Sequence, residues 1–302
     1  MKLNKIIKKV TDKDKFLSIV DYADFCMFYL EYIKNNLQAV IVSRNENNYR
    51  FFQYNKQGTY NITRPINSDL MFSIEEFLKK KEMFFNILNN IRDKNIDTVD
   101  NRKVINNFVY TCQQSIGASL DALPANRSNT ARKINGDLFE RFIRLILNDI
   151  GLNVTSSTVA IPVKIDGEIA FNMNYQHDLL IQVDKNIKAI GSVKTSSKDR
   201  LDKIFIDKFL YNRLTDSETP HFAVFLNDVQ RKGKEGKYGI NATFLPGHFK
   251  GYTIKLNPLD GVYYFDIRPN MRTENILKDH IKTFDNFLIN DVWKFITKNK
   301  RK

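Results

Sequence analysis

Asp178 and Lys194 are a carboxylate and an amine that lie near the ends of two consecutive apolar segments. The segments 178–183 and 188–194 are rich in Leu, Ile, Val and Ala, and the polar residues 184–186 between them are typical of a turn. We expect a hairpin, which would bring the two side chains together. A carboxylate can hold Mg²⁺, which prefers oxygen ligands and keeps several waters. A neighbouring lysine can orient a water or offset phosphate charge, so the pair suits metal-assisted hydrolysis of a phosphodiester.

The charge of the chain favours a polyanionic partner. The 302 residues carry a net charge of +13, from 47 Lys and Arg against 34 Asp and Glu. Nucleic acid and an anionic membrane face are the partners that this excess suits, and a solvated surface rich in Lys and Asn is the alternative. The two cysteines, Cys26 and Cys112, lie in apolar helical patterns and cannot build a disulfide framework or a zinc site.

The sequence offers no membrane or export signal. The first 15 residues lack the long apolar segment of a secretory signal. No uncharged apolar run reaches the roughly 18 residues that are needed to cross a bilayer. We therefore expect a cytoplasmic protein without a membrane partner.

The second half of the chain alternates expected strands and helices. Near-continuous apolar strands are typical of a sheet that is covered on both faces, and a strand–helix–strand order indicates a parallel crossover. We predict an α/β (α+β) fold with a central mixed sheet flanked by helices. The expected strands are 154–163, 168–173, 178–183, 188–194 and 221–226, with a late hairpin of 252–256 and 262–267, and the expected helices are 136–150, 198–214 and a closing helix 273–297.

The first part of the chain, residues 1–118, is predicted to be mainly helical with a small hairpin. Ser73 and Glu76 form a capping-box pattern at a helix start. This region contains no compact set of catalytic groups, and DNA contact, dimerisation and support are its candidate roles. We place the domain boundary in a polar seam, residues 117–133, so that residues 119–302 form the catalytic domain.

The pair Asp178 and Lys194 resembles the PD-(D/E)xK nuclease superfamily, whose pattern is Pro-Asp, then an acidic residue, any residue and Lys. His177 stands where proline is usual, and Ser192 stands where the second acid is usual. One branch of the superfamily restores the missing acid from the following helix. These are type II restriction endonucleases that cut CCGG-, CCNGG- and CCWGG-like sites, including EcoRII-like enzymes. Asp207, with twelve residues between it and Lys194, stands at the corresponding place, although an aspartate departs from the usual glutamate.

The run KTSSKDR, residues 194–200, looks like the KTxxKDR run of the same branch. In the enzymes of that branch, the last residues of the run begin a helix and read C·G pairs in the major groove. The resemblance therefore implies that Lys198, Asp199 and Arg200 contact bases. The forked guanidinium of Arg200 also matches guanine O6 and N7 on general grounds.

A third similarity lies upstream, where Arg132, Lys133, Gly136 and Glu140 resemble the branch's RK…G…E helix start. The glutamate of that pattern belongs to the active site. Without the resemblance, Glu140 would simply suit the dipole of a helix start. The same basic run includes Arg127, and we interpret Arg127, Arg132 and Lys133 as DNA contacts, with a solvated loop as the alternative.

Each candidate also has an ordinary structural interpretation. Asp178 could cap a strand, Lys194 could be a solvated strand end, and Asp207 could pair with Lys203 or Lys208 along a helix. Their joint order, on the expected elements, favours the nuclease. In the first part of the chain, DNA contact is conceivable for Tyr60, Arg64 and the aromatic pair of Phe51 and Phe52, but core packing is the favoured interpretation of these residues.

We predict a Mg²⁺-dependent type II restriction endonuclease. Asp178 and Asp207 are the expected metal ligands, Lys194 assists the water, and Glu140 is a further carboxylate of the site. The resemblance implies a target containing CC/GG, 5′-phosphate ends and a cognate DNA methyltransferase that protects the same site, and a palindromic target implies a homodimer. A DNA repair or junction-resolving nuclease with the same core and a non-catalytic DNA-binding protein are the alternatives.

Overall fold

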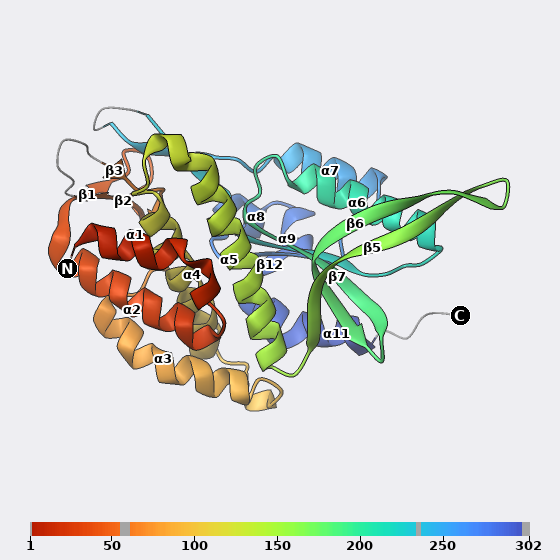
Figure 1. The fold of residues 1–302 in the computed structure, drawn as a ribbon, viewed down its shortest axis with the longest axis horizontal. Coiled ribbons are helices and arrows are strands. Elements are labelled where there is room, and N and C mark those ends of the chain that lie inside the picture. The colour runs from red at the N-terminus through yellow and green to blue at the C-terminus, as the bar shows by residue number, and fades with distance from the viewer. Residues whose placement is uncertain (1, 55–60, 234–236, 298–302) are drawn as a thin grey trace. The chain divides into compact units, whose positions relative to one another are not determined.

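The computed structural model describes residues 2–54, 61–233 and 237–297, and Figure 1 shows their fold. Tyr60 lies outside these ranges. The chain forms two compact units. Unit 1 consists of Met1–Ile146 and Asp228–Thr243, and unit 2 consists of Leu147–Asn227 and Phe244–Lys302.

The two units differ in extent from the expected division at residue 118. The seam is shorter than expected, because helix α4 (Val99–Leu120) continues into it and helix α5 (Ser128–Asp149) starts before it ends. Polar residues on the exposed turns of a helix resemble a loop in sequence. The catalytic role of residues 119–302 stays a prediction.

Unit 1 is built around α4, whose residues 104–120 are all buried. Helices α1 (Leu3–Thr11), α2 (Ile19–Asn36) and α3 (Ile74–Asn89) pack against it. The rings of Phe77 and Phe84 stack on Phe108, with centroids 4.9 and 3.9 Å apart. The predicted capping box of Ser73 and Glu76 at the start of α3 is confirmed.

A small sheet lies beside these helices. Its strands are β1 (Leu37–Val42), β2 (Tyr49–Tyr54), β3 (Asn61–Ile62) and β4 (Ile66–Asn67). A second hairpin of unit 1 comes from later in the chain and consists of β9 (Val229–Lys232) and β10 (Gly239–Ala242). The amide of Asn45 joins this hairpin to the β1–β2 turn through two hydrogen bonds of 2.9 Å with the backbone of Ile240.

Unit 2 contains a six-stranded mixed sheet in the order β12-β11-β8-β7-β6-β5. Strands β5 to β7 form an antiparallel meander, and β7, β8, β11 and β12 run parallel to one another. The parallel crossover from β7 through α6 to β8 was predicted from the sequence and is confirmed. The bounds are β5 (Asn153–Ile165), β6 (Glu168–Val183), β7 (Asn186–Ser196), α6 (Leu201–Thr215), β8 (His221–Asn227), β11 (Gly261–Tyr264) and β12 (Ile281–Thr283).

Both faces of this sheet are covered, as expected. One face packs on α6 and on α7 (Pro246–Lys255) through a cluster that includes Phe205, Phe225 and Phe249. On the other face Phe222 packs against Phe287 and Phe295, with ring centroids 4.7 and 5.8 Å away. The prediction of a central mixed sheet flanked by helices is therefore confirmed.

The late elements differ from those predicted. Residues 252–256 belong to the end of α7 rather than to a hairpin, and β11 pairs in parallel with β8 and β12. The expected closing helix 273–297 is interrupted by β12. A short apolar run fits both the helical and the strand periodicity, and pairing with a neighbouring strand decides which structure forms. The remaining pieces are α8 (Pro269–Thr273), α9 (Leu277–His280), α10 (Phe284–Asn286), the π-helical turn Phe287–Asp291 and α11 (Val292–Thr297).

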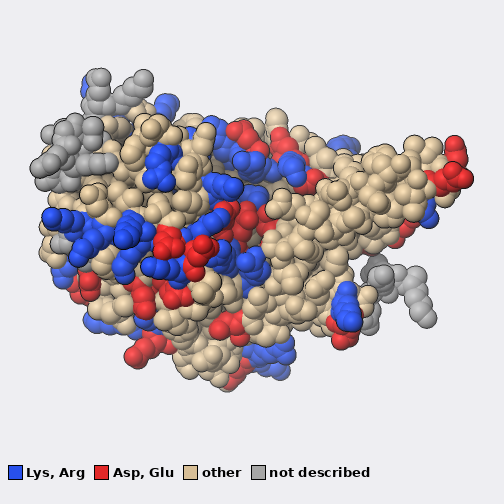
Figure 2. All heavy atoms as spheres, in the orientation of Figure 1, with Lys and Arg blue, Asp and Glu red and all other residues tan. Residues whose placement is uncertain are grey.

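The predicted strands 168–173 and 178–183 are one strand, because the polar residues between them pair with β5, which is also long. The outer part of this β5–β6 hairpin extends past the sheet (Figure 1) and exposes Ile165, Ile169 and Phe171. It carries few charges, and those are gathered at its tip (Figure 2). Among the described residues, none of the helices combines the length and the apolarity needed to cross a membrane.

Candidate active site

Asp178 lies at an irregularity in β6. Two β5 residues, Thr155 and Ser157, pair with Leu180 and His177, so three steps of β6 oppose two steps of β5. The extra residue is a β-bulge, a feature that re-aims side chains and is common beside active sites. The Oδ2 atom of Asp178 accepts a hydrogen bond of 2.9 Å from the Val193 backbone N–H on β7.

Lys194 reaches this carboxylate from the neighbouring strand. Its Nζ lies 2.6 Å from Asp178 Oδ2, and the two side chains are 29% and 15% exposed. Ile190, four residues before Lys194, packs against Tyr211 of α6, so alternation along β7 turns Ser192 and Lys194 toward the same helix. The predicted hairpin is confirmed, and it brings the carboxylate and the amine together on the α6 side of the sheet.

Asp207 belongs to the same side of the sheet. It lies one turn before Tyr211 on α6, and the Tyr211 ring is 5.7 Å from the ring of His177. Burial lowers the pKa of His177, and the charges of Asp207 and Asp178 oppose that shift. Both carboxylates therefore act electrostatically on one imidazole. Asp207 Oδ2 also forms an ion pair of 2.7 Å with Nζ of Lys203, one turn earlier on α6. This pair corresponds to the alternative, structural role expected for Asp207.

A second histidine, which is buried, packs against Tyr211. The ring of His221 at the start of β8 lies 5.3 Å from Tyr211, and its side chain is almost fully buried. Burial lowers the pKa of His221 to about 4. The unfolded chain, with an ordinary pKa near 6.5, binds the proton first as the pH falls.

We expect His221 to make the fold sensitive to acid. The stability that the neutral, buried imidazole contributes is lost as the pH falls from about 6.5 to about 4. The free energy of unfolding decreases by about 3 kcal/mol between pH 7 and pH 4 for this reason. The His221→Asn variant should lose less stability over that interval, as measured by urea unfolding at several pH values. The exposed His248→Gln variant is the control and should keep the full dependence. Parallel pH profiles for wild type and His221→Asn would contradict this assignment.

The residues fit a hard cation only in part. Asp178 and Asp207 offer carboxylate oxygens on one side of the sheet, and Mg²⁺ is commonly held by one or two carboxylates together with waters. Within the described ranges, however, no three side chains of His, Cys, Asp or Glu gather closely enough to hold a metal ion. Lysines bond to both carboxylates, so a metal at this site would share the carboxylates with those ammonium groups.

The three residues expected to read bases precede α6 instead of forming its first turn. Helix α6 begins at Leu201 with Arg200 as its N-cap, so the expected start at residue 198 is wrong. Asp199 adopts a positive φ of 53°, which a helix does not allow. Lys198, Asp199 and Arg200 are all exposed. The loop therefore presents three adjacent polar side chains to solvent beside the strand that carries Lys194.

The remaining candidates lie on or just before α5 in unit 1. Arg127, Arg132 and Lys133 are exposed, and Arg132 bonds to Asn129 at 3.3 Å. Glu140 is half-buried on the same helix. Their participation in the site stays a prediction.

Two features of this group of residues could not be predicted from the sequence. The bulge at Asp178 depends on the register in which β6 pairs with β5, and that register cannot be read from the sequence of β6 alone. Tyr175 stacks on His177 and Tyr211 packs edge-on against it, and neither tyrosine belongs to a sequence motif. The helical spacing of Asp207 and Tyr211 was the one signal that could have indicated which face of α6 meets the sheet.

The sheet, its crossover and its covering helices define a restriction-endonuclease fold. The crystal structure of the type IIP restriction endonuclease Kpn2I matches this chain with a TM-score of 0.72 over 99% of both chains, at 19% sequence identity. A more distant structure, the restriction endonuclease PspGI with substrate DNA, has a TM-score of 0.42 at 13% identity, over 74% of this chain and 93% of that chain. No protein-family model and no curated protein matches the sequence.

Proposed function

We propose that this protein is a type II restriction endonuclease that hydrolyses both strands of DNA at a specific sequence. The observation that carries the proposal is the position of Lys194, whose Nζ lies 2.6 Å from a carboxylate that a β-bulge turns toward it. The likeness in fold to Kpn2I, described as a type IIP restriction endonuclease, supports the same class. The net charge of +13 suits DNA as the substrate.

Mg²⁺ is the proposed cofactor, and Asp178 and Asp207 are the residues that would hold it. When bound, the ion supplies Lewis acidity toward the phosphate and lowers the pKa of a water. The proposed role of Glu140 is a further carboxylate of this site. Hard oxygen donors and the absence of a cysteine or histidine cluster among the described residues favour Mg²⁺ over a softer metal.

Lys194 contributes in two ways that follow from its position. Its ammonium group can donate a hydrogen bond to the attacking water and fix the direction of the lone pair that attacks phosphorus. It can also offset the charge that develops on the phosphate oxygens. The Asp178 carboxylate accepts hydrogen bonds from both the Lys194 ammonium group and the Val193 backbone N–H, which orient the pair.

The exposed loop before α6 is proposed to read bases. Arg200 offers a planar fork to guanine O6 and N7, Asp199 can accept from cytosine N4, and Lys198 offers a point charge. Arg127, Arg132 and Lys133 are proposed as phosphate contacts, which fix the position of the protein on the duplex. Exposed lysines on α1 add to the basic surface (Figure 2); they are Lys5, Lys8 and Lys9.

The finer properties follow from the resemblance and remain part of the proposal. The target is a palindrome containing CC/GG, the products carry 5′-phosphates, and a homodimer places one active site on each strand. A cognate methyltransferase protects the same sequence in the host without stable binding. The protein is proposed to act in the cytoplasm.

Digestion of unmethylated plasmid DNA tests the function. We expect discrete fragments in the presence of Mg²⁺ and none when the ion is removed by EDTA. End sequencing of the fragments gives the target and the cut position. A smear or cleavage of branched DNA alone would favour a repair or junction-resolving nuclease, and tight, salt-dependent binding without any cleavage would favour a non-catalytic DNA-binding protein.

A further inference from the structure

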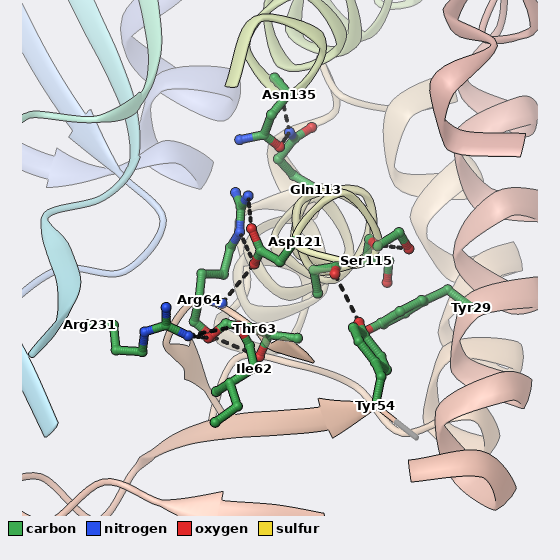
Figure 3. Close-up of polar contacts among 12 residues, drawn as sticks. Tyr29, Tyr54, Ile62, Thr63, Arg64, Gln113, Ser115, Asp121, Asn135 and Arg231 are labelled. Atoms are coloured by element: carbon green, nitrogen blue, oxygen red, sulfur yellow. Dashed lines mark hydrogen bonds and ion pairs between the residues drawn. The ribbon is translucent and has the colours of Figure 1, made fainter. Parts of the chain in front are cut away.

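Arg64, in the segment between β3 and β4, is held in one orientation by Asp121 at the end of α4. The Nε atom of Arg64 donates to Asp121 Oδ2 at 2.9 Å, and Nη2 donates to Oδ1 at 2.8 Å. The Arg64 backbone N–H donates to the same carboxylate at 2.7 Å. Figure 3 shows the guanidinium lying along α4 and turned toward Asp121.

The helix is shaped to accept this side chain. A Cβ on Gly117, one turn before Asp121, would overlap Nη1 of Arg64 and come within 2.6 Å of its Cζ. The neighbour Thr63 is fully buried, and its hydroxyl donates to the Arg64 carbonyl at 3.0 Å. The backbone and the side chain of Arg64 are therefore both fixed before any ligand binds.

The ion pair with Asp121 occupies one edge of the Arg64 guanidinium and leaves the other edge available for a ligand. Asp121 occupies the edge formed by Nε and Nη2, and none of the described residues accepts a hydrogen bond from Nη1. The side chain is 23% exposed. The edge formed by Nη1 and the second hydrogen of Nη2 can therefore donate two parallel hydrogen bonds to a planar pair of acceptors.

DNA offers two kinds of paired acceptors, the phosphate oxygens and guanine O6 with N7, and the net charge of the Arg64–Asp121 pair favours one of them. A phosphate contact draws its strength from net positive charge, which the Asp121 carboxylate cancels here. A guanine contact draws its strength from directed donors aimed at O6 and N7, and Asp121 improves that aim. The arrangement therefore suits a base better than a phosphate.

A second arginine and helix α5 lie near this pair in unit 1. Gln113 and Asp121 share a face of α4 and are about 12 Å apart along it. The Gln113 amide bonds to Asn135 of α5 at 3.0 Å, so α5 contacts α4 at this point (Figure 3). Arg231 lies on the other side, where its Nη1 donates to the Ile62 carbonyl at 2.8 Å.

We propose that Arg64 reads a guanine of the DNA target through its Nη1–Nη2 edge, with Asp121 as the residue that orients it. This inference rests on the proposed function and adds a base contact from unit 1 to those from the loop before α6. The contact would contribute to the choice of sequence and not to the hydrolysis itself.

The test compares binding to the target found by plasmid digestion with binding to unrelated duplex DNA, in the absence of metal. We expect Arg64→Gln to lower the ratio of specific to non-specific affinity about 10- to 100-fold. Arg64→Lys keeps the charge and the link to Asp121 and should lose a similar factor, which covers the case in which the glutamine variant folds poorly. Replacing the contacted guanine by 7-deazaguanine should weaken wild-type binding and leave Arg64→Lys binding unchanged.

Arg102→Gln provides the matched control. Arg102 makes the same two-bond pair with Asp97, at 2.6 and 2.9 Å, but it lies near the other end of α4, about 28 Å from Asp121. Its substitution should leave the specificity ratio unchanged. A uniform loss of affinity for all sequences by Arg64→Gln, with a salt dependence reduced by about one counterion, would assign a phosphate contact and overturn the proposal.

The outcomes separate this inference from the function on which it rests. If wild type cuts plasmid DNA at discrete sites and Arg64→Lys retains full specificity, the base contact is wrong while the nuclease stands. If wild type neither binds nor cuts a specific sequence, the proposed function itself fails.

Discussion

The Lys194→Ala variant is expected to retain DNA binding and to lose cleavage by a factor of about 100 to 1,000, the range that removal of one positioned hydrogen-bond donor costs. Lys194 contacts the candidate metal ligand Asp178 directly and lies on the α6 side of the sheet. Its removal takes away the donor that orients the water while the sheet keeps its register. Because the side chain is 29% exposed, the remaining carboxylate can be solvated and the fold should persist.

The measurement is single-turnover cleavage of a labelled duplex, with affinity determined separately without metal. Lys188→Ala is the matched control, because Lys188 is another lysine of the same strand, six residues before Lys194. It should cut at the wild-type rate. Wild-type rates from Lys194→Ala would refute the assignment of the active site, and a parallel loss of binding would mean that Lys194 is a phosphate contact.

The hairpin that brings Asp178 to Lys194 could be predicted from sequence because both of its signals are local. Apolar strands and a polar turn between them fix which residues can pair, and the structure contains that pair. The crossover through α6 was predictable for the same reason, since a helix between two buried strands forces a parallel connection.

The features that the sequence did not indicate depend on contacts between distant segments. The bulge at Asp178 arises from a register difference between β5 and β6, which no periodicity records. Strand β12 interrupts an apparently helical pattern because β11 offers it a partner. The pairing of Arg64 with Asp121 spans 57 positions of the chain, and neither residue belongs to a motif.

The carboxylate of Asp207 gives a second decisive experiment, because this helix residue is proposed to replace an acid that is missing from β7. Removing it by Asp207→Ala is expected to lower the cleavage rate at a given Mg²⁺ concentration by more than the roughly 10- to 100-fold that loss of an outer-shell partner costs. The loss should shrink as the Mg²⁺ concentration rises, because the side chain is proposed to bind the ion.

The structure suggests how that loss could be reversed. Ser192 lies two residues before Lys194 on the same face of β7, where the resemblance places the usual acid. Adding Ser192→Asp to Asp207→Ala should recover part of the lost rate, since a carboxylate returns to the same side of the sheet. Asp202→Ala, in the first turn of α6, is the control for a general loss of acidic charge and should cut normally.

The double substitution separates a metal ligand from a structural ion pair. If Asp207 acts only through Lys203, then Lys203→Gln should reproduce the Asp207→Ala defect and Ser192→Asp should recover nothing. If Asp207 binds the ion, Lys203→Gln should leave the rate intact or raise it, because a competing ammonium is removed. The rate as a function of Mg²⁺ concentration in the four variants therefore decides which role the helix carboxylate has.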